Sequence, residues 1–283
     1  MRLRPATPAD AQRAADLVIA GDIADVGVAD YSLGDLEDEW RELDLDADTR
    51  LVEDDEGAIV GCAHFRGSDV LAQVDPNREG EGFGTALLTW SEKRASQRGA
   101  TKVRQGVGDR GQSARALLQA HGYAKTRSFW RMERPATTDE APADETGLRP
   151  VDPTDAPTLY DVTIRAFAHD TGYEIKPLDE WTRREFNGHG VDHTLSRTAD
   201  GIGYALVRRW DEDTLYIPLL AVHPDHQGQG LGARLLRSVF AAARGRRVTL
   251  NVASDNPYAV RLYERVGMQA AWRVDDYQKA LPN

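Results

Sequence analysis

The spacing of apolar residues predicts alternating strands and helices in the second half of the chain. Residues 201–208 and 214–222 have the pattern of two adjacent strands joined by a polar turn at Trp210–Asp213. Upstream, the short segment Leu148–Arg149 leads through a proline into a helix with a polar cap. The remaining elements follow in order: a helix over 231–244, a strand over 248–252, a helix over 257–266 and a strand around 271–274. This order predicts a mixed sheet with helices on both faces, an α/β or α+β fold.

The two halves of the chain also repeat each other. Three stretches recur in the same order at an offset of 145 to 148 residues: 3–11 as 148–156, 74–84 as 222–232, and 121–123 as 266–268. Matches in one order at nearly one offset indicate a tandem duplication. We therefore predict two domains, 1–135 and 148–283, joined by a polar, proline-containing linker at 136–147.

Length and composition limit the classes of function. A chain of 283 residues is long enough for two domains with separate cores, and its net charge of -11 argues against a general nucleic-acid binder. Its single cysteine, Cys62, and a start without an apolar signal segment favour a cytoplasmic protein, and the longest apolar run, 215–222, is too short for a membrane span. Because the histidines are scattered, we expect no metal. Acidic residues gather over 22–56, either to attract a cationic substrate or as an ordinary solvated face.

A glycine-rich segment, 227–232, lies between a predicted strand and a predicted helix. Glycines let the backbone approach a ligand, and the N–H groups at a helix start attract phosphate, so this segment predicts a phosphate-bearing cofactor. The spacing of Gly228, Gly230 and Ala233 also satisfies the dinucleotide fingerprint. However, five residues separate the strand from the first glycine, and only about fifty residues follow, too few for a doubly wound sheet. No Gly-Lys-Ser/Thr follows, which excludes a P-loop.

Two longer segments resemble the signatures of the GNAT N-acetyltransferase superfamily. Residues 219–232 match a strand followed by Val-x-Pro and then Gln-x-x-Gly-x-Gly. Residues 256–268 match Asn-x-x-Ala-x-x-Leu-Tyr-x-x-x-Gly-Phe, with methionine in the last place. The resemblance covers nearly all of the second copy. It implies two tandem GNAT-like domains, each a mixed, largely antiparallel sheet flanked by helices, with acetyl-CoA as cosubstrate.

The resemblance also implies roles for individual residues. The backbone of Leu220, Ala221 and Val222 would pair with the pantetheine arm. Asn256 would contact the cofactor arm, and Tyr263 would donate a proton to the departing thiolate as general acid. The pyrophosphate would lie in a cradle formed by Gln227, Gly228, Gln229, Gly230, Leu231, Gly232 and Ala233. An amine acceptor also needs a base, and several candidates stay open: Tyr216, Asp213, Glu174, His169, His189 and His193.

The first copy lacks the residues that this chemistry needs. Glu79 and Glu81 lie at the positions of the two loop glutamines, and carboxylates oppose a pyrophosphate. Gly111 lies at the position of the asparagine and Leu118 at that of the tyrosine, and a leucine cannot donate a proton. We therefore predict that the first copy is not catalytic.

The acceptor is predicted to be the primary amine of a small molecule, acetylated by direct transfer. Tandem GNAT proteins of this length resemble mycothiol synthase, which acetylates the amine of a cysteinyl pseudodisaccharide, and this acceptor is one alternative. Acetylation of a peptide or protein is another, and a regulatory protein that binds CoA without turnover is a third. Since two copies are already fused, we expect a monomer or weak dimer with no nucleic-acid or membrane partner.

Overall fold

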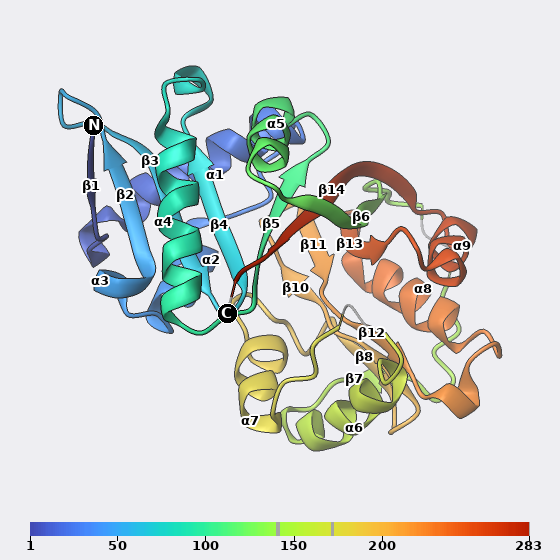
Figure 1. Cartoon of the computed structure of the whole chain (residues 1–283). Helices are drawn as coiled ribbons and strands as arrows, with labels where there is room; N and C mark the ends of the chain where they lie inside the picture. Colours follow the sequence, from blue (N-terminus) through green and yellow to red (C-terminus); the bar gives the residue numbers. More distant parts are fainter. Residues whose placement is uncertain (140–141, 171–172, 283) are drawn as a thin grey trace. The chain divides into compact units, whose positions relative to one another are not determined.

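The computed structural model describes residues 1–139, 142–170 and 173–282 (Figure 1). By their contacts they form two compact units, the first made of residues 1–129 and 272–282 and the second of residues 130–271. Both units are mixed α/β structures in which antiparallel pairing prevails. The predicted fold class is therefore confirmed.

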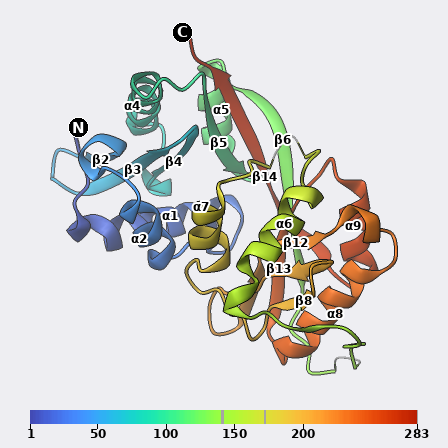
Figure 2. The ribbon, with the colours of Figure 1, turned by 90° about the horizontal axis from the view of Figure 1, so that it is seen from below.

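The first unit places its sheet between helices. Its elements are β1 (Arg2–Arg4), α1 (Ala11–Asp25), α2 (Leu33–Arg41), α3 (Leu45–Asp48), β2 (Thr49–Glu53), β3 (Ile59–Arg66), β4 (Asp69–Val74), α4 (Phe83–Gln97), β5 (Lys102–Gly108), α5 (Gln112–Ala120), the first half of β6 (Ala124–Arg134) and most of β14 (Gln269–Ala280). Strands β1 to β4 are antiparallel, β4 meets β5 in parallel, and β14 runs antiparallel to β5. Helix α4 covers one face of β2–β4, and α1 and α2 cover the other (Figures 1 and 2).

The second unit repeats this order of elements. It contains the end of β6, β7 (Arg149–Pro150), α6 (Ala156–Ala166), α7 (Leu178–Trp181), β8 (Arg197–Ala199), β9 (Gly203–Ala205), β10 (Arg208–Arg209), β11 (Thr214–Ile217), β12 (Leu220–Val222), α8 (Leu231–Ala243), β13 (Arg247–Ala253) and α9 (Pro257–Arg265). The two helices predicted over 231–244 and 257–266 are confirmed to within one residue at each end.

Alternation of side chains along β9 and its continuation divides the core of the second unit. Ala205 and Val207 pack with residues of α8, α9, β11 and β13. Tyr204 and Leu206 face the other way and pack with α6, α7 and the neighbouring aromatic residues. A strand with both faces buried is therefore covered by helices on each side, in agreement with the predicted mixed sheet with helices on both faces.

The prediction of two uninterrupted strands, 201–208 and 214–222, is wrong in one respect. Each is divided in two, because β11 pairs with β10 whereas β12 pairs with β9. Pro218 lies at the break between β11 and β12 and has no backbone N–H to continue a ladder. A hydrogen bond of 2.9 Å from the Leu206 nitrogen to the Leu219 oxygen joins the two breaks.

The compact units and the sequence repeat divide the chain at different places. Residues 272–280 of β14 belong to the second copy in sequence but to the first unit by contact. Residues Trp130–Arg134 of β6 belong to the first copy but to the second unit, where Met132 enters the core. Each copy therefore gives its last strand segment to the other unit.

The predicted linker, 136–147, includes residues 140 and 141, which lie outside the described residues, as does residue 283 at the end of the second predicted domain. The last residues of the predicted linker lie against α8 of the second unit. Arg234 forms an ion pair of 3.0 Å with Asp144, and the Ser238 hydroxyl donates a hydrogen bond of 2.7 Å to Glu145. The end of this polar segment is thus held in place by named contacts.

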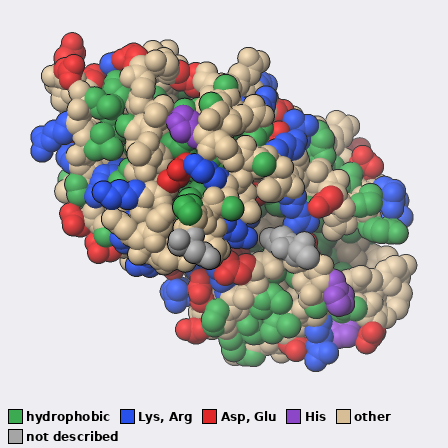
Figure 3. All heavy atoms as spheres, in the orientation of Figure 1, with side chains coloured by type: hydrophobic (Ala, Val, Ile, Leu, Met, Phe, Trp, Pro, Cys, Tyr) green, Lys and Arg blue, Asp and Glu red, His purple; other side chains and the backbone are tan. Residues whose placement is uncertain are grey.

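The surface carries both signs of charge. In Figure 3, acidic and basic side chains are scattered over the visible face and hydrophobic side chains occur between them. Among the described residues, no helix has the length and apolar character that a membrane crossing requires.

Candidate active site

The backbone of the second unit changes its pairing partner at the end of β11. Residues Thr214–Ile217 of β11 pair in parallel with β13. After Pro218 the chain leaves β13, and Leu220–Val222 pair instead with β9, so that β12 becomes the edge strand of a four-stranded sheet. An edge strand presents backbone N–H and C=O groups on its outer side, where an extended ligand can add as another strand. Leu220, Ala221 and Val222, which sequence reasoning placed against the pantetheine arm, form this edge.

The glycine loop follows β12 after the short 3-10 turn Pro224–His226 and ends at the start of α8. Gly228 and Gly230 adopt positive φ angles of 75° and 86°, which side chains other than glycine adopt only with strain. A Cβ atom added at either glycine would meet no atom within 4 Å, so space remains above the loop. The first N–H that bonds back into the helix is that of Arg234, to the Gly230 oxygen at 3.1 Å.

The N–H groups of Leu231, Gly232 and Ala233 precede that first helical bond, so they belong to the helix start that attracts an anion. Gly232 also has a packing role, because a Cβ there would lie 3.2 Å from the Leu262 side chain of α9. The loop, the helix start and α9 are thereby brought together.

The two loop glutamines brace the loop from within. The Gln227 amide donates a hydrogen bond of 3.0 Å to the Val222 oxygen, and the Gln229 amide donates one of 3.1 Å to the Asp225 oxygen. Both side chains are otherwise exposed. Sequence reasoning placed them in the cradle itself. In the structure the Gln227 side chain ties the cradle to β12, and the Gln229 side chain ties it to the turn that follows β12.

Tyr263 lies on α9, in the core that α8 and α9 share with β11 and β13. It is 8% exposed, and burial, reinforced by the nearby Tyr216 phenol, raises the pKa of Tyr263 to about 12. The phenol is therefore un-ionised at neutral pH and holds a proton that it can donate. This protonation state suits a general acid.

Asn256 caps the helix that carries Tyr263. Its side-chain oxygen accepts a hydrogen bond of 3.1 Å from the Ala259 nitrogen, one of the donors that the helix start leaves unpaired. Asn256 was expected to contact the cofactor arm. In the structure its carbonyl oxygen is engaged in the cap, and its amide group remains for any such contact.

An aromatic and cationic cluster surrounds Tyr216 on β11, one residue before the strand end. The Arg131 guanidinium lies 4.9 Å from the centre of the Tyr216 ring, and Trp210 meets that ring edge-on at 5.8 Å. The Asn251 amide donates a hydrogen bond of 3.4 Å to the Tyr216 oxygen. Sequence reasoning singled out Tyr216 but missed Arg131, Trp210 and Asn251, because they come from three different elements that only the tertiary fold brings together.

The other candidates for the general base have different surroundings. The His193 Nε2 atom lies 2.8 Å from the Phe186 backbone oxygen, and the His193 ring packs against the Phe186 ring at a tilt of 38°. Glu174 pairs with Lys176 at 2.7 Å. His169, His189 and Asp213 are exposed. Of the six candidates, Tyr216 is the one that contributes to the raised pKa of Tyr263.

The first unit keeps the fold of this site but changes its chemistry. Gly82 caps α4 with a φ of 88°, as Gly230 caps α8. Glu79 and Glu81 occupy the loop, and Leu118, in the position of Tyr263, is buried in an apolar core.

Comparison with known proteins gives a consistent result. Residues 25–123 and 157–268 each match the family model described as Acetyltransferase (GNAT) family. A mycothiol acetyltransferase of Stackebrandtia nassauensis is 31% identical over 258 residues, which cover 82% of each chain. A mycothiol acetyltransferase of Actinosynnema mirum is 30% identical over 241 residues, covering 78% of this chain and 80% of the relative.

Solved structures agree over the whole length. A GCN5-related N-acetyltransferase from Sphaerobacter thermophilus has a TM-score of 0.79 and 26% identity, covering 100% of this chain and 96% of that one. A tandem GNAT protein from the clavulanic acid biosynthesis pathway has a TM-score of 0.74 with coverage of 100% and 99%, and its 16% identity bears on the fold alone.

Proposed function

The chain belongs to the GNAT acetyltransferase family, an N-acetyltransferase family that uses acetyl-CoA as acetyl donor, and we propose that its second unit acetylates the primary amine of a small molecule. In this proposal β12 and the glycine loop hold the cosubstrate, and Tyr263 acts as general acid. The predicted class of enzyme and the predicted cosubstrate agree with the family. The residue roles and the acceptor are the proposed part.

One observation carries the proposal: an outward-facing edge strand, an open glycine loop at a helix start and a buried, un-ionised tyrosine occur together in one unit. The edge strand suits the amide-containing arm of CoA, because that arm can pair with backbone groups. The helix start suits its pyrophosphate. The first unit has the loop but neither the tyrosine nor a loop free of carboxylates.

The reaction is direct transfer. The amine nitrogen attacks the thioester carbonyl carbon, a C–N bond forms, and the C–S bond breaks. The departing sulfur takes the phenolic proton of Tyr263, which solvent later replaces, and the amine loses its own proton to a base or to water. The neutral amine is the attacking form, since an ammonium group has no free electron pair.

The experiment is an acceptor screen on the full chain. Thiol release from acetyl-CoA would be followed over a panel of primary amines, with the acetylated product identified by mass spectrometry. We expect amide product from at least one amine and none from the matching alcohols. Binding of acetyl-CoA without product from any amine, including an N-terminal cysteine analogue and a peptide, would contradict the proposal and favour the regulatory alternative.

A second candidate acceptor follows from the relatives named mycothiol acetyltransferase, which cover about four fifths of the chain at 30–31% identity. The cysteinyl pseudodisaccharide of the mycothiol pathway therefore belongs in the panel. If it is acetylated with a kcat/KM at least about 100-fold above that of simple amines, this pseudodisaccharide is the acceptor. A smaller ratio favours another amine.

A further inference from the structure

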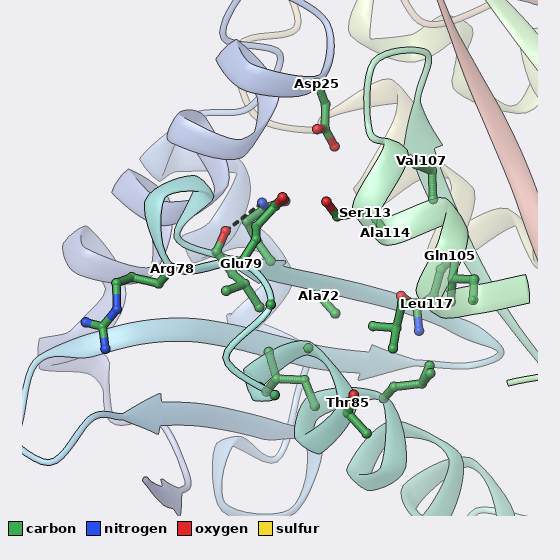
Figure 4. Close-up of a pocket in the computed structure, with 18 of the residues that line it drawn as sticks. Asp25, Ala72, Arg78, Glu79, Thr85, Gln105, Val107, Ser113, Ala114 and Leu117 are labelled. Atoms are coloured by element: carbon green, nitrogen blue, oxygen red, sulfur yellow. Dashed lines mark hydrogen bonds between the residues drawn. The ribbon is translucent and has the colours of Figure 1, made fainter. Parts of the chain in front are cut away.

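The first unit contains a cavity of about 320 Å³ at the place where the repeat would put a cofactor. It lies between the end of β4, the loop at Gly80–Gly82, β5 and α5 (Figure 4). The same elements of the second copy, β12, the glycine loop, β13 and α9, form the candidate active site. The fold has therefore retained a cleft in a unit that has lost the catalytic tyrosine.

The charge of the loop is wrong for a phosphate. Glu79 borders the cavity, and Glu81 lies in the same loop. Arg78, the basic residue next to them, points away from the cavity (Figure 4). Its guanidinium pairs with Glu81 of the loop at 2.7 Å and with Asp54, the residue after β2, at 2.9 Å, so the charge of Arg78 is already neutralised. A pyrophosphate placed here would face the carboxylate of Glu79 and lack a cation from Arg78.

A second carboxylate enters the cavity from another element. Asp25, the last residue of α1, extends into the space that Ser113 and Glu79 border (Figure 4). Partial burial, reinforced by the charge of Glu79, raises the pKa of Asp25 to about 6, against an opposing influence of Arg115. The Arg115 guanidinium donates instead to the Asp109 oxygen at 3.2 Å. Among the described residues, no cationic group lies within 4.0 Å of the Asp25 or Glu79 carboxylate.

The remaining wall is mainly apolar, and its polar side chains are those of Gln73, Thr85, Gln105 and Ser113. Val107, Leu87 and Leu118 line the cavity with aliphatic carbon. Gln105 also lines it and is 9% exposed, and its side-chain amide lies close enough to the Tyr123 phenol to oppose the rise that burial causes in the pKa of that phenol. The cavity therefore offers carboxylates and a largely aliphatic wall.

We infer that this cavity binds a small organic cation, an ammonium group on a short apolar body, between Asp25 and Glu79. The two carboxylates repel each other and would both gain from a shared cation. The aliphatic wall would accept the body of the ligand. This ligand class differs from the phosphate-bearing cosubstrate of the second unit. The inference stands on the first unit alone and does not depend on the proposed reaction.

The test uses 4-bromobenzylamine and its uncharged counterpart 4-bromobenzyl alcohol on the full chain. Crystals soaked with the amine should show an anomalous bromine peak in this cavity. Calorimetry should show the amine binding at least tenfold more tightly than the alcohol. The Asp25→Asn/Glu79→Gln double variant should lose at least tenfold in amine affinity, whereas Glu37→Gln, an exposed acid of the same unit, should change nothing.

Three results would overturn the inference. Equal affinity for amine and alcohol would show an apolar pocket without recognition of charge. A bromine peak only in the second unit, together with wild-type amine affinity in the double variant, would assign binding to the acceptor site of the second unit. Binding of two CoA molecules per chain, one of them lost in Gly82→Asp, would show that the first unit still holds the nucleotide. None of these outcomes bears on acetyl transfer by the second unit.

Discussion

Tyr263 is the residue on which the proposed chemistry depends. Its phenol is buried and un-ionised, so replacing it with phenylalanine removes the proton and little volume. We expect Tyr263→Phe to lower kcat by about 100-fold or more, the usual contribution of a general acid. The Kd for acetyl-CoA should stay within about twofold, because the tyrosine is not proposed to hold the cosubstrate. Steady-state kinetics and calorimetry measure the two quantities.

A matched control lies on the same helix. Tyr258 is 78% exposed on α9, and its ring contacts Arg261, so Tyr258→Phe removes a hydroxyl without touching the core. It should leave kcat unchanged. A similar loss in both variants would assign the effect to α9 as a whole and not to proton donation by Tyr263.

Asp25 should weaken the fold at neutral pH in the absence of a ligand. Its pKa is raised to about 6 in the folded protein, above the value of about 3.9 for an unfolded aspartate, so the folded state binds more protons between these values. The stability contributed by the protonated carboxyl is fully present below pH 4 and is lost as the pH rises through 6. The ionised Asp25 carboxylate therefore lowers the free energy of unfolding at pH 7. Because the group is only partly buried, solvent screening limits this loss to about 1 kcal/mol.

Asp25→Asn should therefore raise the free energy of unfolding by about 1 kcal/mol at pH 7 to 8 and by nothing measurable at pH 4. Urea unfolding at the two pH values measures the difference. Glu37→Gln, which removes an exposed carboxylate, serves as the control for a general change of net charge. A gain of the same size at both pH values would mean that packing, and not ionisation, causes it.

At the scale of elements, the glycine loops of the two copies provide a direct comparison. Gly230 and Gly82 both precede a helix with nearly equal φ angles, 86° and 88°, and a Cβ at either would meet no neighbour within 4 Å. Alanine at each position should cost about 1–2 kcal/mol of backbone strain. Only the second loop is proposed to cradle the pyrophosphate.

Gly230→Ala should raise the Kd for acetyl-CoA about tenfold, because binding would have to restore the strained loop. Gly82→Ala should leave that Kd unchanged, although both variants should lower the melting temperature to a similar extent. Calorimetry with thermal unfolding on both variants checks this. Equal effects on Kd would mean that loop strain acts through overall stability or that both loops bind.

Asn256 offers a second test, because capping and cofactor contact call for different replacements. Asn256→Ala should destabilise the protein by about 1 kcal/mol, whereas Asn256→Ser retains a capping oxygen and should restore most of it. If the side-chain amide also contacts the cofactor arm, both variants should raise the Kd for acetyl-CoA. If Asn256→Ser has both the stability and the acetyl-CoA Kd of the wild type, the role of Asn256 is limited to capping the helix.

The elements also show where prediction from the sequence ends. Periodicity placed α8 and α9 within a residue of their observed bounds, because helix periodicity and caps are local signals. The segment 214–222 has one apolar pattern throughout, yet its first half pairs with β13 and its second with β9. Apolar periodicity reports burial and does not report which strand is the partner. The outer edge of β12 in the candidate site results from that change of partner, and only the GNAT motif pointed to it.

For the whole molecule, the repeat predicted two copies correctly, and both copies match the family model. Where the compact units begin and end is a separate matter. The boundaries drawn from the repeat, 1–135 and 148–283, assume that each copy folds on itself. Contacts place 272–282 with the first unit and 130–135 with the second, a pairing between distant segments that has no local signal in the sequence.

Tyr277 makes this exchange testable. It belongs to the second copy in sequence, but it is 2% exposed and packs with Val103, Val107 and Leu118 of the first unit. Tyr277→Ala should cost about 3–5 kcal/mol, as other large-to-small changes in a core do. Because that core lies under β5 and α5, hydrogen exchange should accelerate at the amides of these two elements. Protection in α8 and β13 should be kept.

Met268→Ala provides the reverse case only nine residues earlier in the chain. Met268 is 1% exposed and packs in the core of the second unit, so its loss should release the amides of α8 and β13 and leave β5 and α5 protected. Exchange followed by mass spectrometry separates the two patterns. If both variants released the same amides, the two cores would unfold as one cooperative structure. If Tyr277→Ala released α8 instead of β5, the boundary drawn from the sequence repeat would be the physical one.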